Sequence, residues 1–337
     1  MPTLADTPLP GLDKLTSVLA ASPPVLFFFL GMLAAAVRSN LHVPKAVTKL
    51  LSLYLLWAIG FQGGVKLVKG GLTGEAVAAL GAAMLLACVI PVYSFFLLKK
   101  RVSIHNAAAI AAAYGSVSAV TFMAASTVLT AKGIEFGGHM VAAMALMESP
   151  AIVIAVVLMR LAERSNPAQP ATANAGWGKL LHEAFLNGPV LLLLGSMAIG
   201  MITGERGYHA FKPLCTDLFS GVLVFFLLDL GLLAARRFKD LRKAGWALIT
   251  FGIATPLLNA GLALALAWTL GLTPGDGALL MVMAASASYI AVPAAVRLVI
   301  PQATPGLYIP LPLAVTFPFN VGIGIALYTY LATLVLG

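Results

Sequence analysis

Two stretches of small and hydroxyl-bearing residues interrupt apolar segments that otherwise suit a membrane-spanning helix. The first, AAAYGSVSAVT, covers Ala111–Thr121, and the second, AASASYIAVPA, covers Ala284–Ala294. Glycine weakens a helix, hydroxyl groups compete for its backbone hydrogen bonds, and Pro293 removes a helical donor. Interrupted spans in corresponding positions of two half-chains are typical of the binding site of a secondary transporter.

Two such breaks that meet near the middle of a membrane would suit an anion together with a cation. A half-helix that begins at a break directs its free N–H groups toward an anion, while freed carbonyls and hydroxyls suit a hard cation such as sodium. We expect six side chains at this site: Ser116, Ser118 and Thr121, facing Ser286, Ser288 and Tyr289. The alternative is that the small residues only let helices pack closely.

Ionisable residues within apolar segments are further candidates for function. Glu148 could ligate a cation, carry a proton, cap a kink at Pro150 or pair with a neighbouring helix. In the corresponding region of the second half-chain, Thr316 and Asn320 offer neutral oxygen ligands. Asp229 is expected to be an interfacial carboxylate, because two arginines follow it within two helical turns.

The composition indicates an all-α polytopic membrane protein. Hydrophobic residues make up 60% of the 337 residues and charged residues 10%, against about 25% charged in a soluble domain. The surplus of nine positive charges is then typical of basic cytoplasmic loops and does not indicate a nucleic-acid partner. No phosphate-binding loop, nucleophile–base pair or metal-ligand spacing is visible, so we expect neither an enzyme nor a cofactor. The GxxxG pairs carry little weight alone.

Ten apolar spans are predicted, arranged as five, a linker and five. The first half covers residues 1–161, the linker 162–183 and the second half 184–337. At an offset of about 168 residues, Thr48 and Ser52 correspond to Thr216 and Ser220, and Pro150 corresponds to Pro318. An odd number of spans in each half predicts an inverted repeat.

The distribution of basic residues predicts the orientation in the membrane. With alternating spans, fifteen lysines and arginines fall on the side of the linker and six on the side of the termini. The positive-inside rule makes the linker side cytoplasmic and both termini extracytoplasmic.

Five blocks of the sequence resemble the sodium-dependent bicarbonate permease family of cyanobacteria and other bacteria. These blocks are AAAIAAAYGSVSAVTF (107–122), GGHMVAAMALMESPAIV (137–153), GVLVFFLLDLGLLAARR (221–237), ASASYIAVPAAVRLVIP (285–301) and LAVTFPFNVGIGIALY (313–328). The resemblance covers nearly the whole chain. It implies a multi-pass protein of the bacterial inner membrane that imports bicarbonate with sodium as the coupling ion.

The resemblance also implies an architecture and a set of site residues. A gate domain (about 24–69 and 184–237) and a core domain (about 74–161 and 243–336) would move by an elevator mechanism within a homotrimer surrounded by membrane lipid. The family's anion site carries over onto Gly115, Ser116, Val117 and Ser118, and onto Ser286, Ala287, Ser288 and Tyr289. The implied sodium ligands are Ser116, Ser118, Thr121, Ser288, Glu148, Thr316 and Asn320.

Three alternatives bear on partner and substrate. Cyanobacterial members are inhibited by a PII-like protein from the cytoplasmic side, and the short, weakly charged linker of this chain counts against that partner. The same plan could carry small organic anions, which a roomier apolar cavity would favour. The chain could also be a membrane sensor or docking platform that binds an anion without transporting it.

Overall fold

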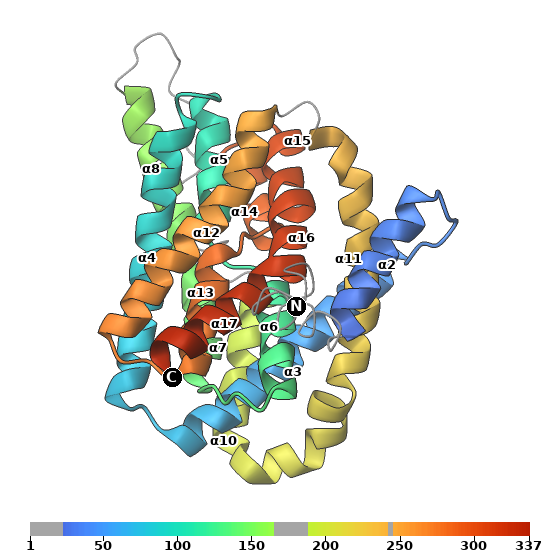
Figure 1. The fold of residues 1–337 in the computed structure, drawn as a ribbon, viewed down its shortest axis with the longest axis vertical. Coiled ribbons are helices and arrows are strands. Elements are labelled where there is room, and N and C mark those ends of the chain that lie inside the picture. The colour runs from blue at the N-terminus through green and yellow to red at the C-terminus, as the bar shows by residue number, and fades with distance from the viewer. Residues whose placement is uncertain (1–22, 165–187, 242–244) are drawn as a thin grey trace, which may run out of the picture.

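The computed structural model describes residues 23–164, 188–241 and 245–337, and these ranges consist of helices joined by short loops, without a strand (Figure 1). The predicted linker therefore lies outside the described residues from residue 165 onward. The helices of the first half are α2 (Pro23–Ala36), α3 (Lys45–Gly70), α4 (Gly74–Leu98), α5 (Ile104–Gly115), α6 (Ala119–Ala131), α7 (His139–Glu148) and α8 (Pro150–Arg164). The second half contains α10 (Gly188–Lys212), the π-turn η1 (Pro213–Asp217), α11 (Phe219–Leu241), α12 (Trp246–Thr269), α13 (Pro274–Ala285), α14 (Ala291–Val299), α15 (Pro305–Tyr308), the π-turn η2 (Pro312–Thr316), α16 (Phe317–Phe319), the π-turn η3 (Asn320–Gly324) and α17 (Ile325–Leu336).

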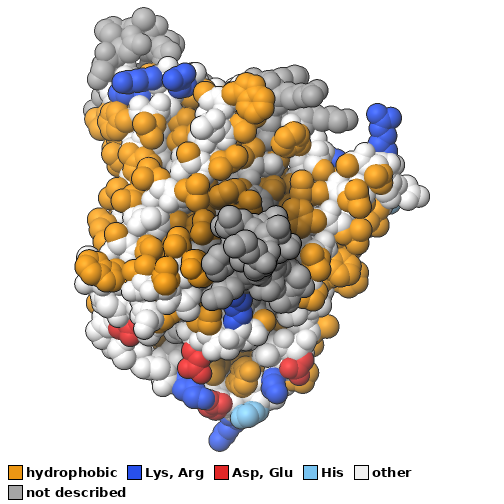
Figure 2. All heavy atoms as spheres, in the orientation of Figure 1, with side chains coloured by type: hydrophobic (Ala, Val, Ile, Leu, Met, Phe, Trp, Pro, Cys, Tyr) orange, Lys and Arg blue, Asp and Glu red, His pale blue; other side chains and the backbone are white. Residues whose placement is uncertain are grey.

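Seven helical runs of the described chain are long and apolar enough to cross a membrane, which confirms the prediction of a polytopic membrane protein. The longest run, Gly188–Phe238, contains the left-handed Gly204 (φ 54°) and the π-turn η1. Figure 1 shows that this run turns back on itself between α10 and α11. Hydrophobic side chains cover a broad middle band of the visible face, and most visible charged side chains gather toward its two ends (Figure 2).

Glycines bring α2 against α11 and α3 against α10, and these two pairs have the most extensive helix contacts of the described chain. A Cβ atom on Gly31 would lie 2.1 Å from the carbonyl oxygen of Leu228, and one on Gly231 would lie 2.0 Å from that of Phe28. Because only glycine permits so close an approach of backbones, these positions determine how the helices cross.

The same close contacts recur between α3 and α10. A Cβ atom on Gly64 would lie 2.0 Å from the carbonyl oxygen of Met197, and one on Gly200 would lie 2.2 Å from that of Phe61. Gly200 follows Gly31 by 169 residues and Gly231 follows Gly64 by 167 residues. The GxxxG pair Gly60/Gly64 therefore lies at a close contact between helices, which its spacing alone did not establish.

A second group of helices surrounds the two predicted breaks. α4 packs against α5, α7 and α8, while α13 packs against α12 and α17. α5 and α13 are each 12 residues long, and the hydroxyls of Ser103 and Thr273 cap their first turns by accepting from the N–H groups of Asn106 and Asp276. Such caps satisfy donors that an isolated helix leaves free.

Candidate functional site

The first predicted break separates α5 from α6. α5 ends at Gly115, where an added Cβ would lie 2.6 Å from Pro91 Cδ, so glycine lets the end of this helix rest against α4. Ser116 is extended (φ −89°, ψ 171°), and the hydroxyl of Ser118 caps α6 by accepting from the Thr121 N–H at 3.3 Å. The hydroxyl thus replaces a helical acceptor that the break removes.

The second predicted break separates α13 from α14 and has nearly the same geometry. Ser286 is extended (φ −82°, ψ 171°), which matches Ser116 in the first break. The Ser288 hydroxyl accepts from the Val292 N–H at 3.3 Å, as Ser118 does in α6. Pro293 lies within α14, so the proline follows the break and does not form it.

The two breaks are hydrogen-bonded to each other. The Ser118 N–H donates to the Ser286 hydroxyl at 2.8 Å, and the Ser288 N–H donates to the Ala113 carbonyl at 2.8 Å. Segments far apart in the sequence therefore meet at the breaks, through the non-helical Ser118, Ser286 and Ser288 and the last turn of α5. This mutual pairing satisfies backbone groups that no water would reach in a membrane interior.

Side chains of other helices satisfy the carbonyls that the breaks set free. Asn259 and Asn320 donate from their amide nitrogens to the carbonyls of Ala284 and Ala285, each at 2.8 Å. In the opposite sense, the hydroxyl of the break residue Ser116 donates to the carbonyl of Glu148 at the end of α7, at 3.1 Å. The amide oxygen of Asn259 accepts from Tyr93, so this asparagine joins α12 to both α4 and α13.

Thr316 and Asn320 make buried contacts beside the breaks. The Thr316 hydroxyl lies 2.6 Å from the Tyr114 hydroxyl and donates to the Gly252 carbonyl at 2.8 Å. The Asn320 amide oxygen accepts from the Tyr328 hydroxyl at 3.0 Å. Both residues therefore hold the framework of the breaks together, and neither lines the cavity described next.

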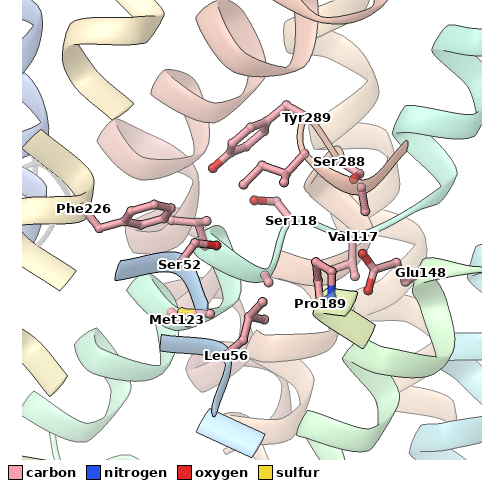
Figure 3. Close-up of a pocket in the computed structure, with 14 residues that line it drawn as sticks. Ser52, Leu56, Val117, Ser118, Met123, Glu148, Pro189, Phe226, Ser288 and Tyr289 are labelled. Atoms are coloured by element: carbon pink, nitrogen blue, oxygen red, sulfur yellow. The ribbon is translucent and has the colours of Figure 1, made fainter. Parts of the chain in front are cut away.

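A small cavity lies where the breaks face α3, α10 and α11 (Figure 3). Its lining comprises Ser52, Leu56, Val117, Ser118, Ala119, Val120, Met123, Glu148, Pro189, Phe226, Ser288, Tyr289, Ile290 and Ala291. About 50 Å³ is open to the centres of water-sized molecules. Since one water needs about 10–15 Å³ by this measure, the cavity has room for a few waters or a small ion pair.

Two polar groups at the cavity are free to meet a ligand. The Glu148 side chain is partly exposed to the cavity, and its carboxylate has no hydrogen-bond or ion-pair partner within the described ranges. The buried hydroxyl of Tyr289 likewise lacks a partner of normal geometry among these residues. Figure 3 shows the Tyr289 ring directed toward Ser118 and the space in front of Phe226. An unsatisfied polar group inside a membrane protein is costly, which makes both candidates for ligand contact.

The other predicted residues lie behind the cavity. Gly115, Ser116, Ser286 and Ala287 are buried in or beside the breaks without lining the cavity. Thr121 lies in the first turn of α6, and its buried hydroxyl has no hydrogen-bond partner among the described residues.

Several residues that complete the site escaped the sequence analysis. Leu56, Pro189 and Phe226 line the cavity from α3, α10 and α11, and Ser52 had been noted only as part of the repeat. Asn259 could have been predicted from the sequence, because it is an amide side chain within an apolar span, and polar residues in such spans usually have a structural or functional role. The leucine, proline and phenylalanine carry no such signal, because only the packing of distant helices brings them to the breaks.

Asp229 does not simply extend toward the membrane surface. Its carboxylate is half-buried and accepts from the Thr48 hydroxyl at 2.7 Å, which joins α11 to α3. Thr48 lies one turn from Ser52 and Asp229 lies one turn from Phe226. The bond therefore supports two of the cavity-lining residues contributed by these helices.

The fold and the site define a class: a multi-pass helical membrane protein with two paired, broken helices beside a small, mostly apolar cavity that contains a few polar groups. The chain belongs to the Na⁺-dependent bicarbonate transporter superfamily, whose family model matches residues 23–333. This match confirms the resemblance seen in the sequence. No curated protein matches the chain. Within the described residues, no group of three or more histidine, cysteine or acidic side chains is arranged to hold a metal ion.

Proposed function

We propose that this protein is a secondary active transporter that carries bicarbonate into the cell together with sodium by alternating access. One observation carries the proposal: two broken helices are hydrogen-bonded across their breaks and face a small cavity with an unpaired carboxylate. Sodium is the coupling ion, and no cofactor takes part. Family membership supports the substrate pair.

The two ions would occupy different parts of the site. Free N–H groups at the first turns of α6 and α14 lie at the cavity, where Ala119, Val120 and Ala291 contribute to its lining. Helix N-termini favour an anion, so bicarbonate would bind there beside Ser118, Ser288 and Tyr289. The Glu148 carboxylate would attract sodium, which would lie between the two negative charges and reduce their repulsion.

The size of the cavity favours bicarbonate over a larger organic anion. An open volume of about 50 Å³ suits an anion with few non-hydrogen atoms together with one cation, and a longer apolar chain would need more room. Five of its lining residues are polar: Ser52, Ser118, Glu148, Ser288 and Tyr289. A dicarboxylate substrate would require a substantially larger opening.

An inverted repeat of two five-span halves is the architecture we propose. Its support lies in contacts that recur at nearly constant offset, namely the glycine contacts of α2 with α11 and of α10 with α3, and the matched breaks. The extensive pairing of α2, α3, α10 and α11 supports their assignment to a gate domain, with the remaining helices as a core domain that moves in an elevator-type transition.

Orientation, assembly and regulation complete the proposal. The excess of basic residues on the linker side supports a cytoplasmic linker and extracytoplasmic termini in a bacterial inner membrane. We propose a homotrimer, which native mass spectrometry in detergent would test. The short linker argues against control by a PII-like protein, and a pull-down with such a protein at equal concentrations would test this.

The decisive experiment is uptake of labelled bicarbonate into proteoliposomes. We expect accumulation under an inward sodium gradient and none under an equal potassium gradient. Flux that is independent of the sodium gradient would contradict symport. Saturable binding without flux would indicate a sensor. Competition by acetate or succinate at tenfold excess would reveal an organic-anion site, and we expect neither to compete.

A further inference from the structure

Two further cavities lie along α3 and α6, beyond the cavity at the breaks. The first is lined by Ile59, Gln62, Lys66, Ser126, Thr127, Thr130, Ala131, Phe136, Thr216, Phe219 and Ser220. The second is lined by Lys66, Lys69, Gly70, Thr130, Gly133, Ile134, Glu135, Phe136, Gly137 and Gly138. On α3 and on α6, the lining residues advance by about one helical turn from each cavity to the next. The three cavities therefore lie in series between the breaks and the surface beside Gly70, and the two outer ones share Lys66, Thr130 and Phe136.

Lys66 lies where the two outer cavities meet, and it lines both of them. Its ammonium is 3.9 Å from the centre of the Phe136 ring, and this cation–π contact holds the side chain across the route. Of the charged side chains that the structure describes, Lys66 is the only one lining the cavity nearer the breaks. An ion in this cavity thus meets the positive charge of Lys66, whereas Lys69 lines only the outer cavity.

Two acidic groups, Glu135 and Asp276, lie within electrostatic reach of Lys66 without forming a direct ion pair with it. The Asp276 carboxylate accepts from the Gly137 N–H at 2.7 Å and lies 3.0 Å from the His139 ring nitrogen. Glu135 lines only the outer cavity, and no ion pair within 4.0 Å joins it to Lys66. Lys69 differs, because its ammonium is 3.1 Å from the Glu205 carboxylate at an exposed position.

The other polar groups that line the cavity nearer the breaks are neutral. They can accept hydrogen bonds, but they carry no positive charge that would attract an anion. The hydroxyls of Ser126, Thr127 and Thr130 donate to carbonyls of their own helix at 2.8–2.9 Å, which leaves oxygen lone pairs free. The Gln62 amide nitrogen donates to the Cys215 carbonyl, so its amide oxygen remains available too. In the cavity nearer the breaks, attraction of an anion therefore depends on Lys66.

We propose that Lys66 and the outer cavities form a capture site for a small monovalent oxyanion, separate from the site at the breaks. The inference rests on the proposed function, since it assigns the route by which bicarbonate reaches that site. Lys66 raises the local anion concentration at the mouth, and Phe136 prevents the ammonium from swinging away. The side chain is a recruiting residue that acts before the anion reaches the breaks.

Thiol reactivity tests the capture site without relying on transport. Thr130→Cys, in a background carrying Cys88→Ala and Cys215→Ala, places a thiol at an exposed position that lines both outer cavities. Its rates with anionic and cationic methanethiosulfonates are measured with Lys66 present, after Lys66→Gln and after Lys69→Gln. We expect Lys66→Gln to lower the anionic-to-cationic rate ratio about fivefold and Lys69→Gln to change it less than about twofold.

The results separate this inference from the proposed function. An unchanged ratio in Lys66→Gln would overturn the capture site, whatever the protein transports. The orientation is tested in right-side-out vesicles, where the thiol should react without permeabilisation. If it reacts only after the vesicles are permeabilised, the proposed orientation is wrong, but the rate ratio still measures the effect of the Lys66 charge. Thermal unfolding of each variant excludes a loss of fold as the cause.

Uptake kinetics give the second readout. In proteoliposomes, Lys66→Gln should raise the half-saturating bicarbonate concentration about fivefold, keep the maximal rate within about twofold and weaken the dependence on ionic strength. Lys66→Arg should restore the wild-type value because it keeps the charge. A reduced maximal rate at unchanged half-saturation would contradict recruitment. Absence of uptake in the wild-type protein would instead refute the proposed function.

Discussion

The four serines at the two breaks form different hydrogen bonds and lie at different places relative to the cavity. Ser118 and Ser288 cap the helices that follow them and face the cavity, whereas Ser116 and Ser286 donate to carbonyls behind it. Because each hydroxyl is both small and hydrogen-bonding, it satisfies the backbone without filling the cavity. An apolar replacement would change both properties at once.

Replacing Ser118 or Ser288 with leucine should abolish bicarbonate uptake while the folded protein remains in the membrane. Leucine is bulkier than serine and would project into the small cavity, and loss of the cap would cost about 1 kcal/mol, which a protein of this size tolerates. Ser118→Ala serves as the matched control, because it loses the cap and keeps the space. Uptake by both leucine variants at wild-type rates would mean that the site lies elsewhere.

Replacing Glu148 with glutamine should raise the sodium concentration needed for half-maximal uptake by about tenfold, since among the described residues its carboxylate is the one formal negative charge lining the cavity. Glutamine keeps the shape and the oxygen, so the change isolates the charge. The control is Glu205→Gln, at an exposed carboxylate paired with Lys69. Identical sodium dependence in Glu148→Gln would assign Glu148 a structural role only.

At the scale of the elements, the sequence predicted the breaks better than the packing around them. Glycine, serine and proline within apolar runs are local signals, and they located Ser116–Ser118 and Ser286–Ser288 correctly at non-helical residues. The glycine contacts were not predictable, because the same GxxxG spacing occurs at faces that touch nothing. The π-turns around Thr316 and Asn320 also lacked a local signal, since the side chains of these two residues bond to residues outside their own turns, such as Tyr114, Gly252 and Ala285.

Replacing Gly64 with alanine should destabilise the protein by about 1–3 kcal/mol, because a Cβ would lie 2.0 Å from the Met197 carbonyl oxygen and force α3 from α10. The matched control is Gly195→Ala in α10, where an added Cβ meets nothing within 4 Å. That variant should be neutral or more stable, because alanine favours the helix. Thermal unfolding in detergent measures both, and equal melting temperatures for the two variants would refute a packing role for Gly64.

At the scale of the whole molecule, the cavity lies between two groups of helices. The breaks contribute one wall, and Ser52, Pro189 and Phe226 contribute the other from α3, α10 and α11. Transport by relative movement of these groups requires that their contacts slide. One such contact joins α3 to α7: a Cβ atom on Gly63 would lie 2.7 Å from Val141 Cβ.

A reversible disulfide across this contact tests the movement directly. In Gly63→Cys/Val141→Cys, the second change removes the valine methyl groups that a side chain at residue 63 would meet. The two Cβ atoms then need to separate by only about 1 Å to reach the usual ~3.8 Å of a disulfide. We expect oxidation to stop bicarbonate uptake and a reductant to restore it, with either single variant insensitive to oxidant. Uptake that continued in the fully cross-linked protein would show that α3 and α7 remain together throughout the cycle, and the moving boundary would then have to lie between other helices.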